Sequence, residues 1–276
     1  MTGEIGAGCD ITVVLPHYEC PSLLTSAVAS VMAQTHARWC LVIVDDASPG
    51  LEAVMGVRSR WIDERVLWLR TSANVGPFRI SNRLLPRIVS PFVAFQDADD
   101  WSVPERFEHL LAAADKWRCD IVGSAITRVR ADSSVCIVRP PVDVNRALRS
   151  RHRGGVFWGG TMLCRTAFLR RLGGFDGTTR IGADTDFVHR AVFVGSVRNH
   201  PEPLYGSLER ADSLTQSPST GFDSELRRTY QSRFKRRFYA NLLRHWTGTL
   251  AIRHLQAPPN DVDFHLNYLE NGQRVA

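Results

Sequence analysis

The sequence predicts an α/β fold with a mostly parallel central sheet, helices on both faces and a helical C-terminal extension. Two observations carry this prediction. Across the first 130 residues, short apolar runs alternate with segments of helical periodicity, which is typical of a parallel sheet with crossover helices. Further on, residues 223–246 repeat apolar side chains at helical spacing among many arginines, which indicates one long amphipathic helix.

The candidate strands are short apolar runs of a length that suits buried strands. They cover residues 11–15, 41–44, 66–69, 92–95 and 121–126. Between them, residues 21–34 and 104–117 place apolar side chains at helical spacing, each with a proline at the start. Residues 166–172 predict a short helix, which Gly173 and Gly174 would end. The series as a whole is Rossmann-like.

Composition limits the classes of protein that remain. A hydrophobic content of 44% and a charged content of 22% fit a globular domain. No apolar run reaches the roughly 18–20 residues of a membrane-spanning helix, and the first residues show no secretory signal pattern. We therefore expect a cytoplasmic protein. The six cysteines form no C-x-x-C pair, which favours free thiols, and the net charge of +6 suits an anionic partner.

The most informative segment is the apolar run 92–95, which Asp97, Asp99 and Asp100 follow at once. Asp97 and Asp99 are two residues apart, so in extended backbone they project to the same side. Such a carboxylate pair suits Mg²⁺ or Mn²⁺, which prefer oxygen ligands and keep positions open for substrate phosphates. The alternative is a solvated acidic turn that caps the helix beginning near Pro104.

Polar clusters follow the other candidate strands as well. They are Pro16-His17-Tyr18-Glu19, Asp45-Asp46-Ala47-Ser48, Asn74-Val75-Gly76 and Asp97-Ala98-Asp99-Asp100. Because the carboxyl ends of parallel strands meet at one edge of a sheet, a single crevice could receive all of them. Each cluster alone has an ordinary explanation, since acids after strands often cap helices and Asn-x-Gly is a common turn.

This ordered series resembles the family 2 inverting glycosyltransferases of the A-type fold. Gly173-Gly174-Phe175-Asp176, followed by Gly182 to Phe187 and Arg190, is similar to the acceptor-side segment of that family. The resemblance covers residues 10–216. It implies a catalytic domain over 10–216, with a nucleotide-binding part at 10–130 and an acceptor-side part at 131–216, and a helical extension at 217–276.

The resemblance also implies roles for individual residues. The residues expected to line the nucleotide are Pro16, Tyr18, Glu19, Asp45, Asp46, Asn74, Arg79 and Asp97. Asp45 or Asp46 would accept a hydrogen bond from the base, and Asp97 would contact ribose or metal. Asp99 would ligate a Mg²⁺ or Mn²⁺ ion that bridges the diphosphate. Asp184 would be the catalytic base, with Asp186 as the second choice; the alternative for both is capping of a helix N-terminus.

The expected activity is transfer of a sugar from a nucleotide-diphosphate donor, UDP-linked, to an acceptor hydroxyl with inversion. The acceptor would be a small molecule, a lipid-linked glycan or a peptide, and no nucleic acid partner is expected. A peripheral membrane contact through the basic C-terminal helix stays open beside a solvated face over a core stripe. Ala183 and Arg210 replace an acid and a histidine of the family pattern. A nucleotide-binding pseudoenzyme is therefore one alternative function. A sugar nucleotidyltransferase is the other, because such enzymes also place a metal-binding acidic pair on an α/β sheet, although residues 16–24 contain no glycine for a phosphate loop.

Overall fold

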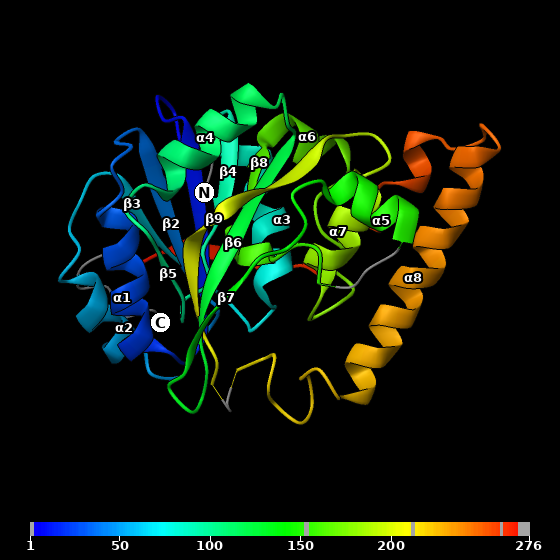
Figure 1. Cartoon of the computed structure of the whole chain (residues 1–276). Coiled ribbons are helices and arrows are strands. Elements are labelled where there is room, and N and C mark those ends of the chain that lie inside the picture. Colours follow the sequence, from blue (N-terminus) through cyan, green and yellow to red (C-terminus); the bar gives the residue numbers. More distant parts are fainter. Residues whose placement is uncertain (1–2, 152–154, 211–212, 260–261, 270–276) are drawn as a thin grey trace.

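The structure is a computed structural model that describes residues 3–151, 155–210, 213–259 and 262–269 (Figure 1). Within these residues the strands form one sheet in the order β10-β3-β2-β1-β4-β8-β6-β9-β5, with β7 beside β6. The strands are β1 (Ile11–His17), β2 (Trp39–Asp45), β3 (Val66–Thr71), β4 (Phe92–Phe95), β5 (Trp101–Ser102), β6 (Ile121–Val129), β7 (Val135–Val138), β8 (Leu163–Arg165), β9 (Val197–Leu208) and β10 (Leu266–Tyr268). The helices are α1 (Pro21–Met32), α2 (Leu51–Arg58), α3 (Pro77–Leu84), α4 (Arg106–Lys116), α5 (Val144–Arg151), α6 (Thr166–Arg171), α7 (Ala183–Ala191) and α8 (Glu225–Trp246).

The predicted parallel core is confirmed for β3, β2, β1 and β4, which are parallel neighbours. Successive residues of β1 face opposite sides of this core. Val13 and Leu15 pack into one hydrophobic cluster, and Val14 packs into the other. A strand that is buried on both faces reads as a continuous apolar run, which is why the sequence pattern identifies it.

Beyond β4 the sheet is mixed. β8 is antiparallel to both β4 and β6, whereas β9 runs parallel to β6. The register between β6 and β9 shifts near Ala125, where Pro203 of β9 is the partner. Proline cannot donate to the ladder and occurs at such irregularities. The sequence analysis did not identify β9, although it is the strand that carries much of the second half of the sheet.

Helices cover both faces of the sheet, as predicted (Figure 1). One hydrophobic cluster joins α1, α2 and α4 to one face through residues such as Leu24, Val54 and Phe107. The other cluster joins α3, α5, α6, α7 and α8 to the opposite face through residues such as Phe187 and Phe238. These two layers fix the strand ends that carry the polar clusters.

The C-terminal segment contains the predicted long helix and also returns to the sheet. α8 buries Phe238 and Leu242 in the second of these clusters, buries Phe234 as well, and exposes Tyr239 and Trp246. After it, β10 pairs antiparallel with β3 at the sheet edge. The extension is therefore helical with an added edge strand, which the sequence did not indicate. No helix in the described ranges has both the length and the apolar character needed to cross a membrane.

Candidate active site

The polar clusters lie where parallel strands end together. His17 at the end of β1 is the register partner of Asp45 at the end of β2. Beside β1, the N–H of Gln96 donates to the carbonyl of Val14 at 3.1 Å, which continues β4 by one residue. The segment after β4 therefore starts from the same sheet edge as the segments after β1 and β2, as expected for parallel strands.

The acidic run after β4 divides into two environments. Asp100 is buried, and its Oδ1 accepts a hydrogen bond from the N–H of Leu208 at 2.9 Å. The backbone N–H of Asp97 donates to the Tyr205 hydroxyl at 3.0 Å. Both hydrogen bonds join the acidic run to β9, so they fix the backbone path of the run. As whole residues, Asp97 is exposed and Asp99 is half-buried.

Two glycines bring Asp184 up to this run. A Cβ atom on Gly160 would lie 2.7 Å from Asp97 Oδ2, and one on Gly159 would lie 2.5 Å from Asp184 Oδ2. The two carboxylates thus lie against neighbouring residues of one short turn, at positions that only glycine leaves open. Asp184 itself stands in the first turn of α7. Segments almost ninety residues apart in the chain therefore meet at this turn.

The carboxylates influence one another electrostatically. Desolvation by the surrounding protein, followed by the negative charges of Asp99 and Asp184, raises the pKa of Asp97 to about 7, although the residue as a whole reaches solvent. Desolvation also raises the pKa of Asp184, against the opposing effect of the N–H of Thr185 and the charge of Arg227. Crowded acids with raised pKa values are typical of functional sites, and a bound cation would relieve their repulsion.

A fully buried arginine lies beneath the acidic run. Arg106, at the start of α4, is 0% exposed. Its guanidinium donates to the carbonyls of Phe95 at 3.0 Å and Gly160 at 2.8 Å, and to Gln96 Oε1 at 3.1 Å. It therefore ties the end of β4 to the turn that faces Asp184. Desolvation lowers the pKa of Arg106 to about 10, although nearby Tyr205 and acidic charges oppose this shift.

Asp99, the expected metal ligand, has an ion-pair partner. Arg210 Nη2 lies 2.8 Å from Asp99 Oδ2, with both side chains about one-fifth exposed. The carboxylates of Asp97 and Asp99 are oxygen donors of the kind that Mg²⁺ and Mn²⁺ prefer, so the donor set fits such an ion. Arg210 supplies a positive charge at the same place.

Asp45 and Asp46 both have internal partners. Asp45 Oδ1 lies 3.2 Å from His17 Nε2, and Arg70 pairs with Oδ2. Burial alone raises the pKa of Asp45, but its hydrogen bonds and the charge of Arg70 outweigh burial and lower it. Asp46 accepts from the N–H groups of Val75 at 2.9 Å and of the next residue at 2.7 Å. These acids hold the loops at the strand ends in place.

Pro16, Tyr18 and Glu19, which were also expected to line the nucleotide, lie at the end of β1 and in the loop that follows it. Pro16 is half-buried in β1, Tyr18 is 43% exposed, and the N–H of Glu19 donates to Ser48 Oγ at 3.0 Å. Glu19 has a φ of 50°, a strained value for this residue type that fixes the loop after β1. Tyr18 therefore offers an exposed aromatic ring in this loop to a ligand.

Asn74 and Arg79 face the segment before α7. Arg180 donates to Asn74 Oδ1, and Arg79 Nε donates to the carbonyl of Gly177 at 2.7 Å. These bonds link the predicted nucleotide side to the predicted acceptor side. Asp186, the second choice for the base, is buried with Arg190 Nε at 2.7 Å from its Oδ2. That ion pair commits Asp186 to the packing of α7, which favours Asp184 as the reactive carboxylate.

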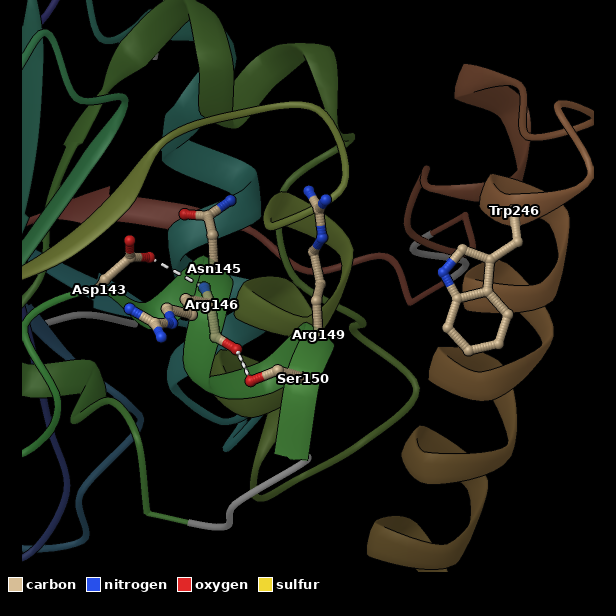
Figure 2. Close-up of a pocket in the computed structure, with 6 residues that line it drawn as sticks. All are labelled: Asp143, Asn145, Arg146, Arg149, Ser150 and Trp246. Carbon is tan, nitrogen blue, oxygen red and sulfur yellow. Dashed lines mark hydrogen bonds between the residues drawn. The ribbon is translucent and has the colours of Figure 1, made fainter.

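A separate hollow of about 390 Å³ lies between α5 and α8 (Figure 2). Asp143, Asn145, Arg146, Arg149, Ser150 and Trp246 line it. Of these, Asp143 is bonded to the N–H of Arg146, and the residues that line the hollow include none of the carboxylates at the sheet edge. We take the sheet edge as the candidate site because the carboxylates of Asp97 and Asp184 lie against one turn there.

Sequence reasoning missed Tyr205, Arg106 and the role of the Gly159-Gly160 turn. Tyr205 is fully buried on β9, and its hydroxyl contacts the acidic run. The position of Arg106 in the sequence could have indicated its role. An arginine in the first turn of a helix directly after an acidic run is well placed to offset the negative charge of that run. Nothing in the sequence indicated the role of Tyr205, since its contacts depend on a strand that the sequence pattern does not reveal.

Comparisons with known proteins identify the family and the fold. The sequence profile described as "Glycosyl transferase family 2" matches residues 12–176. The protein EpsE of Bacillus subtilis (strain 168) is 26% identical over 227 residues, which cover 78% of this chain and 79% of EpsE. The Escherichia coli enzyme WfgD, described as a UDP-Glc:alpha-D-GlcNAc-diphosphoundecaprenol beta-1,3-glucosyltransferase, is 26% identical over 98 residues, or 36% of this chain and 38% of WfgD.

The same fold occurs in S. aureus TarS. Its complex with UDP-GlcNAc matches this structure with a TM-score of 0.63 and 19% identity, over 87% of this chain and 73% of that chain. Its complex with UDP matches with a TM-score of 0.60 and 20% identity, over 86% of this chain and 72% of that chain. Fold and sheet-edge carboxylates together define a glycosyltransferase of the A-type class. The chain belongs to glycosyl transferase family 2, as the match over residues 12–176 shows.

The glycine turn gives a direct test of the geometry. In Gly160→Ala the new Cβ would lie 2.6 Å from the Tyr205 hydroxyl and 2.7 Å from Asp97 Oδ2. Tyr205 is buried and has little room to yield, so both the turn and the Asp97 carboxylate must shift. We therefore expect glycosyl transfer to fall on the order of 10²-fold. The control is Gly56→Ala in α2, where a Cβ meets nothing within 4 Å. That variant should keep full activity and gain roughly 0.5–1 kcal/mol of stability. Equal activity of the two variants would contradict the geometry.

Proposed function

We propose that this glycosyltransferase moves a sugar from a UDP-linked donor to an acceptor hydroxyl, with inversion at the anomeric carbon. The observation that carries the proposal is the meeting of Asp97 and Asp184 at the Gly159-Gly160 turn, with the charge of Asp99 close enough to affect Asp97. The likeness in fold to TarS, whose structures contain UDP and UDP-GlcNAc, supports uridine as the nucleotide.

Asp184 is the general base in this proposal. The acceptor hydroxyl attacks the anomeric carbon from the face opposite the nucleotide and gives its proton to the Asp184 carboxylate. The bond between the anomeric carbon and the diphosphate oxygen breaks, and its electron pair leaves with the diphosphate. Desolvation raises the pKa of Asp184, which makes it a stronger base than an ordinary aspartate.

We propose that Asp97 and Asp99 hold a Mg²⁺ or Mn²⁺ ion when the donor is bound. Such an ion, when bound, neutralises negative charge on the leaving diphosphate. Arg210 lies 2.8 Å from Asp99 and would supply part of this positive charge from the protein itself. An arginine binds phosphate through several donors at once, and so the chain would depend less on metal than a site built of carboxylates alone.

The nucleotide is tested by a thermal-shift panel of UDP, GDP and dTDP, each with and without Mn²⁺. A specific ligand of the native state raises its melting temperature by mass action, by the equivalent of about 2.7 kcal/mol at a concentration of 100 Kd. We expect UDP to give the largest shift and Mn²⁺ to increase it. A larger shift in melting temperature with GDP or dTDP would show that guanosine or thymidine, and not uridine, is the nucleoside of the donor. No shift with any of the three would remove the proposed donor class.

Arg210 is tested by Arg210→Ala with Arg210→Lys as the charge-retaining control. Without metal, we expect UDP to bind Arg210→Ala roughly tenfold more weakly than the native chain, because a charge-assisted hydrogen bond contributes about 1.5–3 kcal/mol. Mn²⁺ should restore most of the loss, and Arg210→Lys should lie between the two. Isothermal titration with UDP measures this. Identical UDP affinities of native and Arg210→Ala protein with and without Mn²⁺ would show that Arg210 has no part in binding the donor.

We propose a lipid-linked glycan as the acceptor. WfgD is named for an acceptor on diphosphoundecaprenol. In this chain, the exposed side chains of α8 include Arg228, Lys235 and Arg236 together with Tyr239 and, at the edge of the hollow, Trp246. Basic and aromatic side chains on one helix face suit contact with an anionic membrane surface. Transfer of labelled sugar to a diphosphoundecaprenol-linked glycan in anionic vesicles tests this, and exclusive use of a peptide or a free small-molecule acceptor would overturn it.

A further inference from the structure

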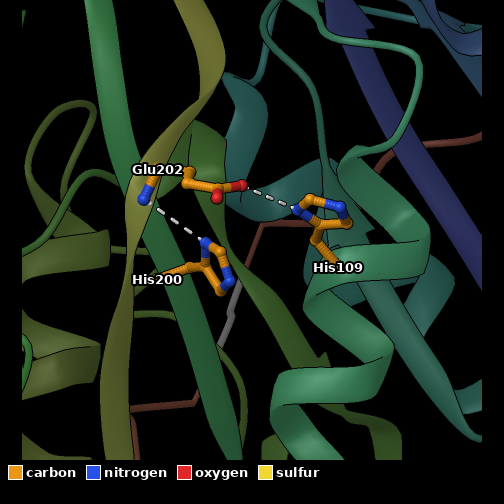
Figure 3. A group of neighbouring side chains, drawn as sticks. All are labelled: His109, His200 and Glu202. Atoms are coloured by element: carbon orange, nitrogen blue, oxygen red, sulfur yellow. Dashed lines mark hydrogen bonds and ion pairs between the residues drawn. The ribbon is translucent and has the colours of Figure 1, made fainter.

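A group of metal-ligating side chains lies apart from the sheet-edge carboxylates, where α4 packs beside β9 (Figure 3). It consists of His109 from α4 and of His200 and Glu202 from β9. One ligand atom from each residue lies within 4.8 Å of those of the other two. His109 Nδ1 is 3.0 Å from Glu202 Oε2, and the two imidazole centroids are 5.5 Å apart. The group thus places two imidazoles and one carboxylate close together.

We propose that His109, His200 and Glu202 form a binding site for Zn²⁺ or a similar transition-metal ion. Two imidazole nitrogens and one carboxylate oxygen suit Zn²⁺, Ni²⁺ or Cu²⁺, whereas Mg²⁺ and Mn²⁺ prefer oxygen ligands. The side chains of His109 and Glu202 are 38% and 58% exposed, so water can complete the coordination. This site differs from the proposed sugar-transfer site in both its ligands and its metal preference.

The surroundings already restrict the ligands. The N–H of Glu202 donates to His200 Nδ1 at a long 3.3 Å, a contact that a metal at this nitrogen would replace. The indole of Trp117 lies 6.1 Å from the His200 ring, centroid to centroid, and limits its rotation. Because the ligands come from a helix and a strand, their positions are more precise than positions on a loop.

The placement gives the site a consequence for the fold. His109 is one helical turn after Arg106, which bonds to Phe95 and Gly160. On the other side, β9 continues from His200 to Tyr205, which contacts the acidic run. An ion at His109 and His200 would therefore fasten together the two elements that support the sheet-edge carboxylates. We expect metal binding to raise the stability of the folded chain by mass action.

The test is isothermal titration of metal-free protein with ZnCl₂, on the native chain, His109→Ala, His200→Ala and the control His36→Ala. His36 is also a half-buried histidine beside a carboxylate, 3.1 Å from Asp10, but it lies outside the group. Loss of a residue that only supports a metal ligand costs 10–100-fold in affinity, so loss of a ligand should cost at least about tenfold. Any zinc bound by the free cysteines is common to all four proteins.

We expect one saturable site in the native chain and in His36→Ala, weakened at least about tenfold in both His109→Ala and His200→Ala. Zn²⁺ should raise the melting temperature of the first two proteins more than that of the last two, and Mg²⁺ should raise none through this site. Equal zinc affinity in all four proteins, or no saturable binding to the native chain, would overturn the proposal. Neither result depends on whether the protein binds UDP.

Discussion

Replacement of Asp184 by asparagine is expected to lower glycosyl transfer by about 10²–10⁴-fold, the contribution typical of a positioned general base. Asparagine keeps the shape of the side chain and can still lie against Gly159, but it cannot accept the acceptor proton. UDP affinity and the melting temperature should therefore change little. Steady-state transfer kinetics combined with titration of UDP measure the two effects separately.

Asp186→Asn is the matched control, because Asp186 lies two residues further along the same helix. Its carboxylate is buried and pairs with Arg190 at 2.7 Å and Arg237 at 3.5 Å. Breaking a buried ion pair costs roughly 3–5 kcal/mol, so this variant should lose stability yet keep the turnover of its folded fraction. If Asp186→Asn were folded but inactive while Asp184→Asn remained active, Asp186 and not Asp184 would be the base.

Replacement of Arg106 by methionine is expected to destabilise the protein by roughly 3–5 kcal/mol. Methionine fills much of the same volume, but it removes the buried guanidinium donor of the Phe95 and Gly160 carbonyls. Gln96 Oε1 also loses this donor and keeps only the Ser102 hydroxyl. It also removes a positive charge that lowers the pKa of Asp97. Urea unfolding measures the loss of stability as a lower midpoint.

Arg38→Met is the control for this change. Arg38 also pairs with a carboxylate, Asp10 at 3.0 Å, but its side chain is 66% exposed. Exposed ion pairs contribute about 0–1 kcal/mol, so its unfolding midpoint should stay near that of the native chain. If Arg106→Met and Arg38→Met unfolded at the same urea concentration, Arg106 would not have the structural role described for it.

The sequence predicted the parallel half of the sheet well because strands buried on both faces leave continuous apolar runs. It failed for β9, where Pro201 and Pro203 interrupt the pattern within a strand of twelve residues. It also failed for β10, a three-residue strand whose pairing with β3 involves residues almost two hundred positions away. Short or interrupted strands form because a neighbouring strand pairs with them. The apolar pattern of the strand's own residues does not reveal that neighbour.

The candidate site shows the same division. The acidic run and Asp184 stood out by residue type and by order along the chain, and the structure brings Asp97 and Asp184 to one turn. Their supports did not stand out. The internal partners of Asp45 and Asp46 lie in other segments, and the environment of Arg106 becomes visible only when α4 packs under β4. The sequence identified the candidate functional residues. Only the packed structure shows which of them already bond to other residues of the protein.

The most direct test is a crystal structure of the protein with UDP and Mn²⁺. We expect the uracil near the loop that carries Tyr18, the diphosphate and Mn²⁺ at Asp97 and Asp99, and space for a sugar between the diphosphate and Asp184. UDP bound elsewhere, for example in the hollow between α5 and α8, would contradict the claim that these carboxylates form one site for sugar transfer.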